Sequence, residues 1–115
     1  MSVAALITDL FFFSKVKGTA DAIGVPIQVV RTADALLEAC RSGVSLAIVD
    51  LNAGGVDPVE AIRQCKTIEP APRVVAYLSH VQTDLAAAAR QAGADAVMPR
   101  SQFSAQLPDL LAGKA

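Results

Sequence analysis

Five short apolar runs, separated by stretches with helical periodicity, constrain the fold of this chain more than any other feature. The runs are VAALIT (3–8), IQVV (27–30), LAIVD (46–50), RVVAYL (73–78) and ADAVM (94–98). Most are apolar at every position, as expected of strands that helices cover on both faces. Strands that alternate with helices predict a parallel sheet with right-handed crossovers. The expected fold is therefore α/β, a doubly wound five-stranded parallel sheet with strand order 2-1-3-4-5.

Capping residues indicate where several of the intervening helices begin and end. Thr32 and Asp57 each precede a helical stripe and suit an N-cap, and Pro58 suits a first turn. Gly93 suits the end of the alanine-rich fourth helix, TDLAAAARQAG. In the last helical segment, we expect Pro108 to bend the helix or delay its start.

Length and composition limit the domain count and the classes of partner. The 115 residues are enough for one domain, 1–115, and 53% of them are hydrophobic. The net charge of -1 gives no basic field for nucleic acid or an anionic membrane. The sequence has no apolar run of membrane-spanning length and no N-terminal signal pattern, so a cytoplasmic protein is expected.

The two cysteines do not form a recognisable metal or redox motif. Cys40 and Cys65 are not part of a CxxC pair, and the single histidine, His80, is distant from both in sequence. A zinc site is therefore not expected. Both cysteines fall inside helical patterns, which favours buried thiols in the core over a redox or ligand role.

Polar residues follow four of the predicted strands. Asp9 and Asp50 end the first and third, Ser79 follows the fourth, and Arg100 follows the fifth. Ligands of doubly wound folds bind beyond the carboxyl ends of the strands, where the strand order reverses. Acids end strands for many structural reasons, but four polar groups at the matching ends predict one shared crevice.

Three stretches resemble the receiver domains of bacterial two-component response regulators. They are LAIVDLNAGGVDPVEAIRQCK around Asp50, LSHVQ after the fourth strand, and AAARQAGADAVMPRS before the last helix. The resemblance covers nearly the whole chain and implies a flavodoxin-like, receiver-like fold. It implies a signalling domain rather than an enzyme, with no output domain attached. The expected partners are a histidine kinase or phosphotransfer protein and a downstream effector, and a homodimer is compatible with it.

The resemblance also implies roles for individual residues. Asp50 would accept the phosphoryl group, Ser79 would be the hydroxyl that turns toward it, and Arg100 would stand where the family has lysine. A Mg²⁺ ion would be held by Asp9, Asp50 and the backbone carbonyl of Asn52. Carboxylate attack on a phosphohistidine needs neutralised charge more than covalent help from the protein.

The chain departs from the family pattern at several of these positions. Leu10 replaces the second acid of the pair after strand one, so Mg²⁺ binding should be weakened or absent. Arg100 has a planar fork in place of a point charge, and either phosphoryl contact or a salt bridge to Asp50 is expected. His80 replaces a very small residue, Val97 replaces an aromatic one, and Ser101 is a candidate cap for the last helix.

Three functions remain open at this point. In the first, Asp50 is phosphorylated, and Ser79 and Arg100 respond to the added charge. In the second, the chain is a pseudo-receiver that binds a partner protein without phosphorylation. The third is a small flavodoxin-like enzyme or nucleotide binder. It is disfavoured because no Gly-rich phosphate loop follows strand one, and because no Ser-His-acid or Cys-His set can be assembled from the single histidine and the buried-looking thiols.

Overall fold

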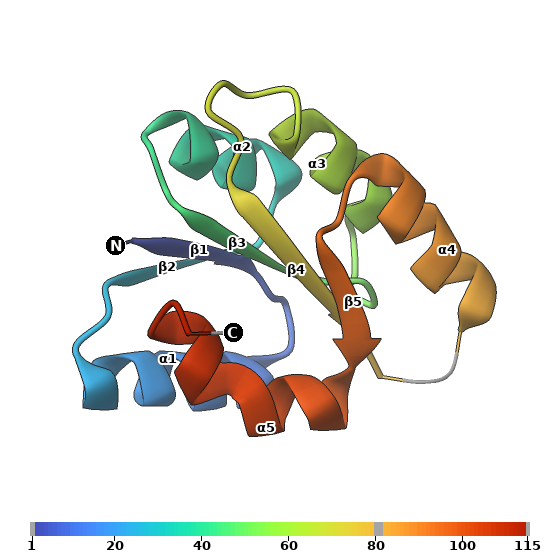
Figure 1. Cartoon of the computed structure of the whole chain (residues 1–115). Coiled ribbons are helices and arrows are strands. Elements are labelled where there is room, and N and C mark those ends of the chain that lie inside the picture. Colours follow the sequence, from blue (N-terminus) through green and yellow to red (C-terminus); the bar gives the residue numbers. More distant parts are fainter. Residues whose placement is uncertain (1, 80–81, 115) are drawn as a thin grey trace.

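The protein is built on one parallel β-sheet, seen here in a computed structural model that describes residues 2–79 and 82–114. The strands run in the order β2-β1-β3-β4-β5, and each neighbouring pair is parallel (Figure 1). This confirms the predicted fold class and strand order. The strands are β1 (Val3–Leu6), β2 (Ile27–Val30), β3 (Leu46–Asp50), β4 (Arg73–Leu78) and β5 (Ala96–Pro99).

Helices cover both faces of this sheet. Figure 1 shows α1 and α5 on one face and α2, α3 and α4 on the other. Every residue of β1 and β3 is buried, which explains why these runs are apolar throughout. The helices are α1 (Leu10–Ile23), α2 (Ala33–Arg41), α3 (Pro58–Cys65), α4 (Thr83–Ala92) and α5 (Arg100–Leu111). Along the described chain, no helix is both long and apolar enough to cross a membrane.

Each face of the sheet has its own hydrophobic core. On the α1 and α5 face, Phe12, Tyr77 and Phe103 form an aromatic cluster. The rings of Tyr77 and Phe103 stack with centroids 4.6 Å apart, and the Phe12 centroid lies 5.0 Å from that of Tyr77. The opposite core includes Leu36, Ile62 and both cysteines, which are buried as predicted. The cluster reaches the carboxyl ends of β3 and β4, because Tyr77 lies opposite Asp50 in the β3–β4 register.

The predicted helix caps are confirmed by side-chain hydrogen bonds at two N-termini and by the backbone conformation at one C-terminus. Thr32 Oγ1 accepts a hydrogen bond from the Ala35 N–H at 3.1 Å, and Asp57 Oδ1 accepts one from the Glu60 N–H at 3.1 Å. Helix α4 ends at Gly93, whose φ of 117° lies in the left-handed region that favours glycine.

The beginning of the last helix differs from the prediction. Helix α5 begins at Arg100 and continues past Pro108 to Leu111, so the expected delay of its start is wrong. Buried Phe103 and Leu107 fix this segment on the sheet, and their burial outweighs the one helical hydrogen bond that proline removes. The expected cap by Ser101 is also wrong, because Pro99 occupies the N-cap position and Ser101 is helical.

Candidate functional site

Asp50 is the one buried charged side chain among the residues that the structure describes. It is the last residue of β3 and only 4% exposed. Its Oδ1 accepts a hydrogen bond from the Asn52 N–H at 2.8 Å. Burial raises the pKa of Asp50, and the Asn52 N–H and the charge of Arg100 oppose this shift. A carboxylate kept in such a place needs a compensating cation or a chemical role.

Asp9 uses both carboxylate oxygens within the protein. The sequence predicted that Asp9 ends the first strand. In the structure β1 ends at Leu6, and Asp9 lies beyond it as the N-cap of α1. Its Oδ1 accepts hydrogen bonds from the N–H groups of Phe11 and Phe12 at 2.9 and 3.2 Å. Its Oδ2 accepts one from an Arg100 Nη at 2.7 Å. The bond from Arg100, followed by that from the Phe12 N–H, lowers the pKa of Asp9.

Arg100 is held from two sides at the start of α5. It pairs with Asp9, and its guanidinium carbon lies 4.3 Å from the centroid of the Phe12 ring. The sequence allowed a salt bridge to Asp50, but the direct partner is Asp9. Its Nε is buried and has no hydrogen-bond partner within the described chain. The charge of Arg100 thus acts on Asp50, although its direct ion pair is with Asp9.

A network of side-chain amides joins the loop after β3 to the end of β4. Asn52 Oδ1 accepts a hydrogen bond from the Ser79 N–H at 2.7 Å. Asn52 Nδ2 donates to Gln82 Oε1 at 2.8 Å. On the other side of the loop, Gly54 N–H donates to Thr8 Oγ1 at 3.0 Å. Sequence reasoning selected Asn52 for its carbonyl and missed these contacts, because long-range amide partners leave no local pattern.

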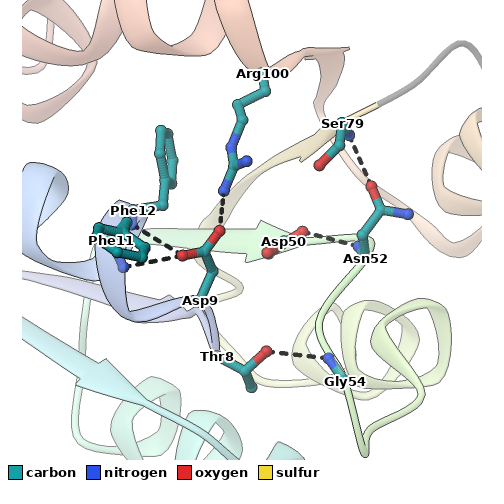
Figure 2. Close-up of polar contacts among 9 residues, drawn as sticks. All are labelled: Thr8, Asp9, Phe11, Phe12, Asp50, Asn52, Gly54, Ser79 and Arg100. Carbon is teal, nitrogen blue, oxygen red and sulfur yellow. Dashed lines mark hydrogen bonds and ion pairs between the residues drawn. The ribbon is translucent and has the colours of Figure 1, made fainter.

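The structure brings the predicted site residues to one edge of the sheet. Figure 2 shows Asp50 lying between the Asp9–Arg100 pair on one side and Asn52 and Ser79 on the other. Arg100 lowers the pKa of Asp50 more than Asp9 raises it, so Arg100 outweighs Asp9 at Asp50. His80, also considered from the sequence, lies outside the described residues.

Tyr77 is a further residue at this edge that the sequence did not single out. It is opposite Asp50 in the β3–β4 register and fully buried. Burial, followed by the charge of Asp50, raises the pKa of its hydroxyl. Both the neutral phenol of Tyr77 and the charge of Arg100 therefore act on Asp50.

The side chains at this edge do not fit a magnesium ion. No cluster of three or more His, Cys, Asp or Glu suited to a metal occurs in residues 2–79 and 82–114. Mg²⁺ binds carboxylate oxygens, but both oxygens of Asp9 already accept hydrogen bonds, and Leu10 is 64% exposed and apolar. The metal ligands predicted at Asp9, Asp50 and Asn52 stay a prediction, and the geometry of Asp9 argues against them.

A groove opens beside the site between α4 and β5. Its volume is about 310 Å³, and its lining is mostly apolar. Ser79 and Gln82 line its end nearest Asn52, and Met98 and Pro99 line its β5 side. The amide network therefore connects the surroundings of Asp50 to this surface.

Comparison with known proteins shows a fold and not a sequence family. No protein-family model and no curated protein matches the sequence. Solved structures do match: the receiver domain of NtrX from Brucella abortus has 20% identity and a TM-score of 0.81, covering 99% of this chain and 96% of that one. A receiver domain protein (CheY-like) from Methanospirillum hungatei JF-1 has 14% identity and a TM-score of 0.80, covering 98% and 94%.

These neighbours define the fold as that of a response regulator receiver domain. The BeF3-activated DrrB receiver domain is a further match, with 15% identity, a TM-score of 0.81, and coverage of 98% of this chain and 95% of that one. The chain spans only 26% of a longer NtrX chain that it also matches, at a TM-score of 0.82. This chain has the CheY-like, flavodoxin-like fold that the sequence predicted.

Proposed function

We propose that this chain is an atypical receiver domain that accepts a phosphoryl group on Asp50 in phosphorelay signalling. The observation that carries the proposal is a buried aspartate at the end of β3 in a receiver fold. Two structural neighbours are described in phosphorylated form. They are RcpA, a cyanobacterial phytochrome response regulator, and a response regulator from Burkholderia pseudomallei with a phosphorylated aspartic acid and a calcium ion.

The transfer is a displacement at phosphorus. A carboxylate oxygen of Asp50 forms the new O–P bond, and the N–P bond of a phosphohistidine breaks with its electron pair left on the imidazole. Charge develops on the phosphoryl oxygens, so a fixed cation beside the acceptor lowers the barrier. Arg100 supplies that cation because Asp9 and Phe12 hold its guanidinium in place. Ser79, from the end of the neighbouring strand, offers a hydroxyl to the phosphoryl group.

The positive charge in this proposal comes from the chain itself. No step depends on magnesium, because both oxygens of Asp9 already accept hydrogen bonds within the chain. Arginine is suited to this role because its planar fork can bind Asp9 and an incoming oxyanion together.

Signalling would pass to a partner protein through the groove between α4 and β5. Ser79 belongs both to the site and to the groove, and Asn52 links it to Gln82. A phosphoryl group that attracts the Ser79 hydroxyl would change this end of the groove. We propose a histidine kinase or phosphotransfer protein as the donor, a cytoplasmic location, and an effector protein at the groove.

The pseudo-receiver is the second candidate, and the Asp9–Arg100 pair favours it. In that pair the Arg100 guanidinium already donates to the Asp9 carboxylate, so less of its charge is available to stabilise an incoming phosphoryl group. In this case the groove binds a partner constitutively.

Chemical phosphorylation separates the two candidates. The full chain is incubated with phosphoramidate or acetyl phosphate, once with Mg²⁺ and once with a chelator, and its intact mass is measured. We expect one phosphoryl adduct in both conditions, lost in Asp50→Asn and kept in Asp34→Asn, which changes an exposed aspartate on α2. No adduct at saturating donor in either condition would leave the pseudo-receiver.

A further inference from the structure

Two buried thiols are in contact on the face of the sheet that does not contain the aromatic cluster. Cys40 is the second-last residue of α2, and Cys65 is the last residue of α3. The Cys40 thiol donates a hydrogen bond to Cys65 Sγ, with the two sulfur atoms 3.6 Å apart. Their exposed fractions are 2% and 0%. The sequence placed both in the core, but it did not place them together.

The spacing of the sulfur atoms is close to what a covalent bond requires. A disulfide has an S–S distance of about 2.05 Å, so the sulfurs must approach by roughly 1.5 Å. Bond formation therefore requires side-chain rotation or a shift of one helix end. The helices α2 and α3 share one core cluster, so they are held as neighbours throughout.

The contact makes the two thiols chemically unequal. When Cys40 is ionised, the contact reverses and the Cys65 thiol donates to the Cys40 thiolate, which lowers the pKa of Cys40 and, together with burial, raises the pKa of Cys65. Cys40 is therefore the thiol that ionises first and attacks an oxidant. Cys65 is in place to attack the oxidised sulfur in the second step.

A small oxidant can reach this pair through the ends of the helices. Both cysteines lie in the last turn of their helices, which is the part of a helix that opens most readily. Opening of such a turn is the route by which a molecule the size of hydrogen peroxide would reach the sulfurs in this proposal.

We propose that Cys40 and Cys65 are a site of reversible disulfide formation, with a peroxide as the oxidant. The Cys40 thiolate attacks one peroxide oxygen, the O–O bond breaks, and hydroxide leaves. Cys40 is then a sulfenic acid. Cys65 sulfur attacks Cys40 Sγ, the S–O bond breaks, and hydroxide takes the Cys65 proton to form water. Two thiols and one hydrogen peroxide thus give one disulfide and two waters, and a dithiol reverses the change.

The bond would join α2 to α3 across the core that continues into the Asp50 loop. That core includes Leu51, directly after Asp50, and Val56, near the end of the loop. The oxidised form therefore fixes the packing behind this loop. The inference does not depend on phosphorylation of Asp50, because it rests only on the contact between the thiols of α2 and α3.

Mass spectrometry of the folded full chain tests the proposal. The chain is treated with hydrogen peroxide, quenched, denatured, and alkylated with iodoacetamide. We expect a loss of two hydrogens, no alkylation at either cysteine, and a peptide that links Cys40 to Cys65. Dithiothreitol should restore two alkylated thiols, and circular dichroism should show that the treated chain stays folded.

The rate and the variants decide the result. The rate constant of disulfide formation should not change on tenfold dilution of the protein, since both thiols are in one chain. Cys40→Ala should leave a single thiol and form no internal cross-link. The proposal is overturned if both cysteines of the wild-type chain still take up the alkylating reagent after peroxide. It is equally overturned if the disulfides join separate chains. Neither outcome requires the variant to fold.

Discussion

Replacing Asp50 by asparagine should stabilise the protein while removing the proposed phosphoacceptor. The carboxylate is 4% exposed and accepts a hydrogen bond from the Asn52 N–H, and burial raises its pKa. The folded protein therefore favours an uncharged group at this position. Asparagine has nearly the same shape and keeps an oxygen for the Asn52 N–H. We expect a gain of about 1 kcal/mol in the free energy of unfolding at neutral pH, or roughly 4 °C in Tm.

The gain should depend on pH with a definite sign. The pKa of Asp50 is higher in the folded chain than in the unfolded chain, so the folded wild type takes up a proton first as the pH falls. The advantage of Asp50→Asn should thus be complete above the folded pKa. It should shrink as the pH falls through that value and vanish below the unfolded pKa.

Urea denaturation followed by circular dichroism measures this difference between neutral pH and about pH 4. Asp34→Asn is the matched control, since it removes the same charge from an exposed position in the first turn of α2. It should cost a few tenths of a kcal/mol through the helix dipole. An Asp50→Asn chain that is less stable than wild type at neutral pH would refute the argument that this carboxylate is held in a desolvated site.

Three further substitutions test the remaining parts of the structure. Leu10→Asp should create Mg²⁺ binding visible by calorimetry, whereas Phe11→Asp, at a position 91% exposed, should not; equal binding by both would mean that the added charge acts nonspecifically. Arg100→Met should slow phosphorylation by a small-molecule donor about 100-fold. Arg100→Lys, which keeps the positive charge, should react at a rate close to that of wild type. A wild-type rate of phosphorylation in Arg100→Met would exclude the cation from the reaction. Phe103→Ala should lower the free energy of unfolding by about 3–5 kcal/mol in urea, and a loss below about 1 kcal/mol would contradict the packing of the aromatic cluster.

The fold was accessible from the sequence because its main signal is local and repeated. Apolar strands such as β3 need cover on both faces, and the alternation with helices leaves a parallel sheet as the consistent arrangement. The caps at Thr32 and Asp57 were predicted for the same reason, since a cap depends on residues three positions away. The delayed start expected from Pro108 was wrong because helix propensity was weighed without the burial of the surrounding α5 residues.

The site was predictable in its members but not in their pairing. The edge rule for parallel sheets places Asp9, Asp50, Ser79 and Arg100 together. It does not say that Arg100 binds Asp9 rather than Asp50, because that choice depends on side-chain reach and on the Phe12 ring. A signal for the cap by Asp9 was present, an aspartate directly before a helical pattern, but its position after a strand favoured a ligand role.

The link between Asp9 and Arg100 has a consequence for how the pocket is assembled. The two residues are 91 positions apart, and one caps the first helix while the other begins the last. A ribosome releases the N-terminal strands and helices first, so a nascent chain displays Asp9 and Asp50 before the balancing guanidinium has emerged. Docking of α5 completes the aromatic cluster and brings in the positive charge in a single event. Under the proposed function, an incomplete chain should therefore be unable to receive a phosphoryl group prematurely.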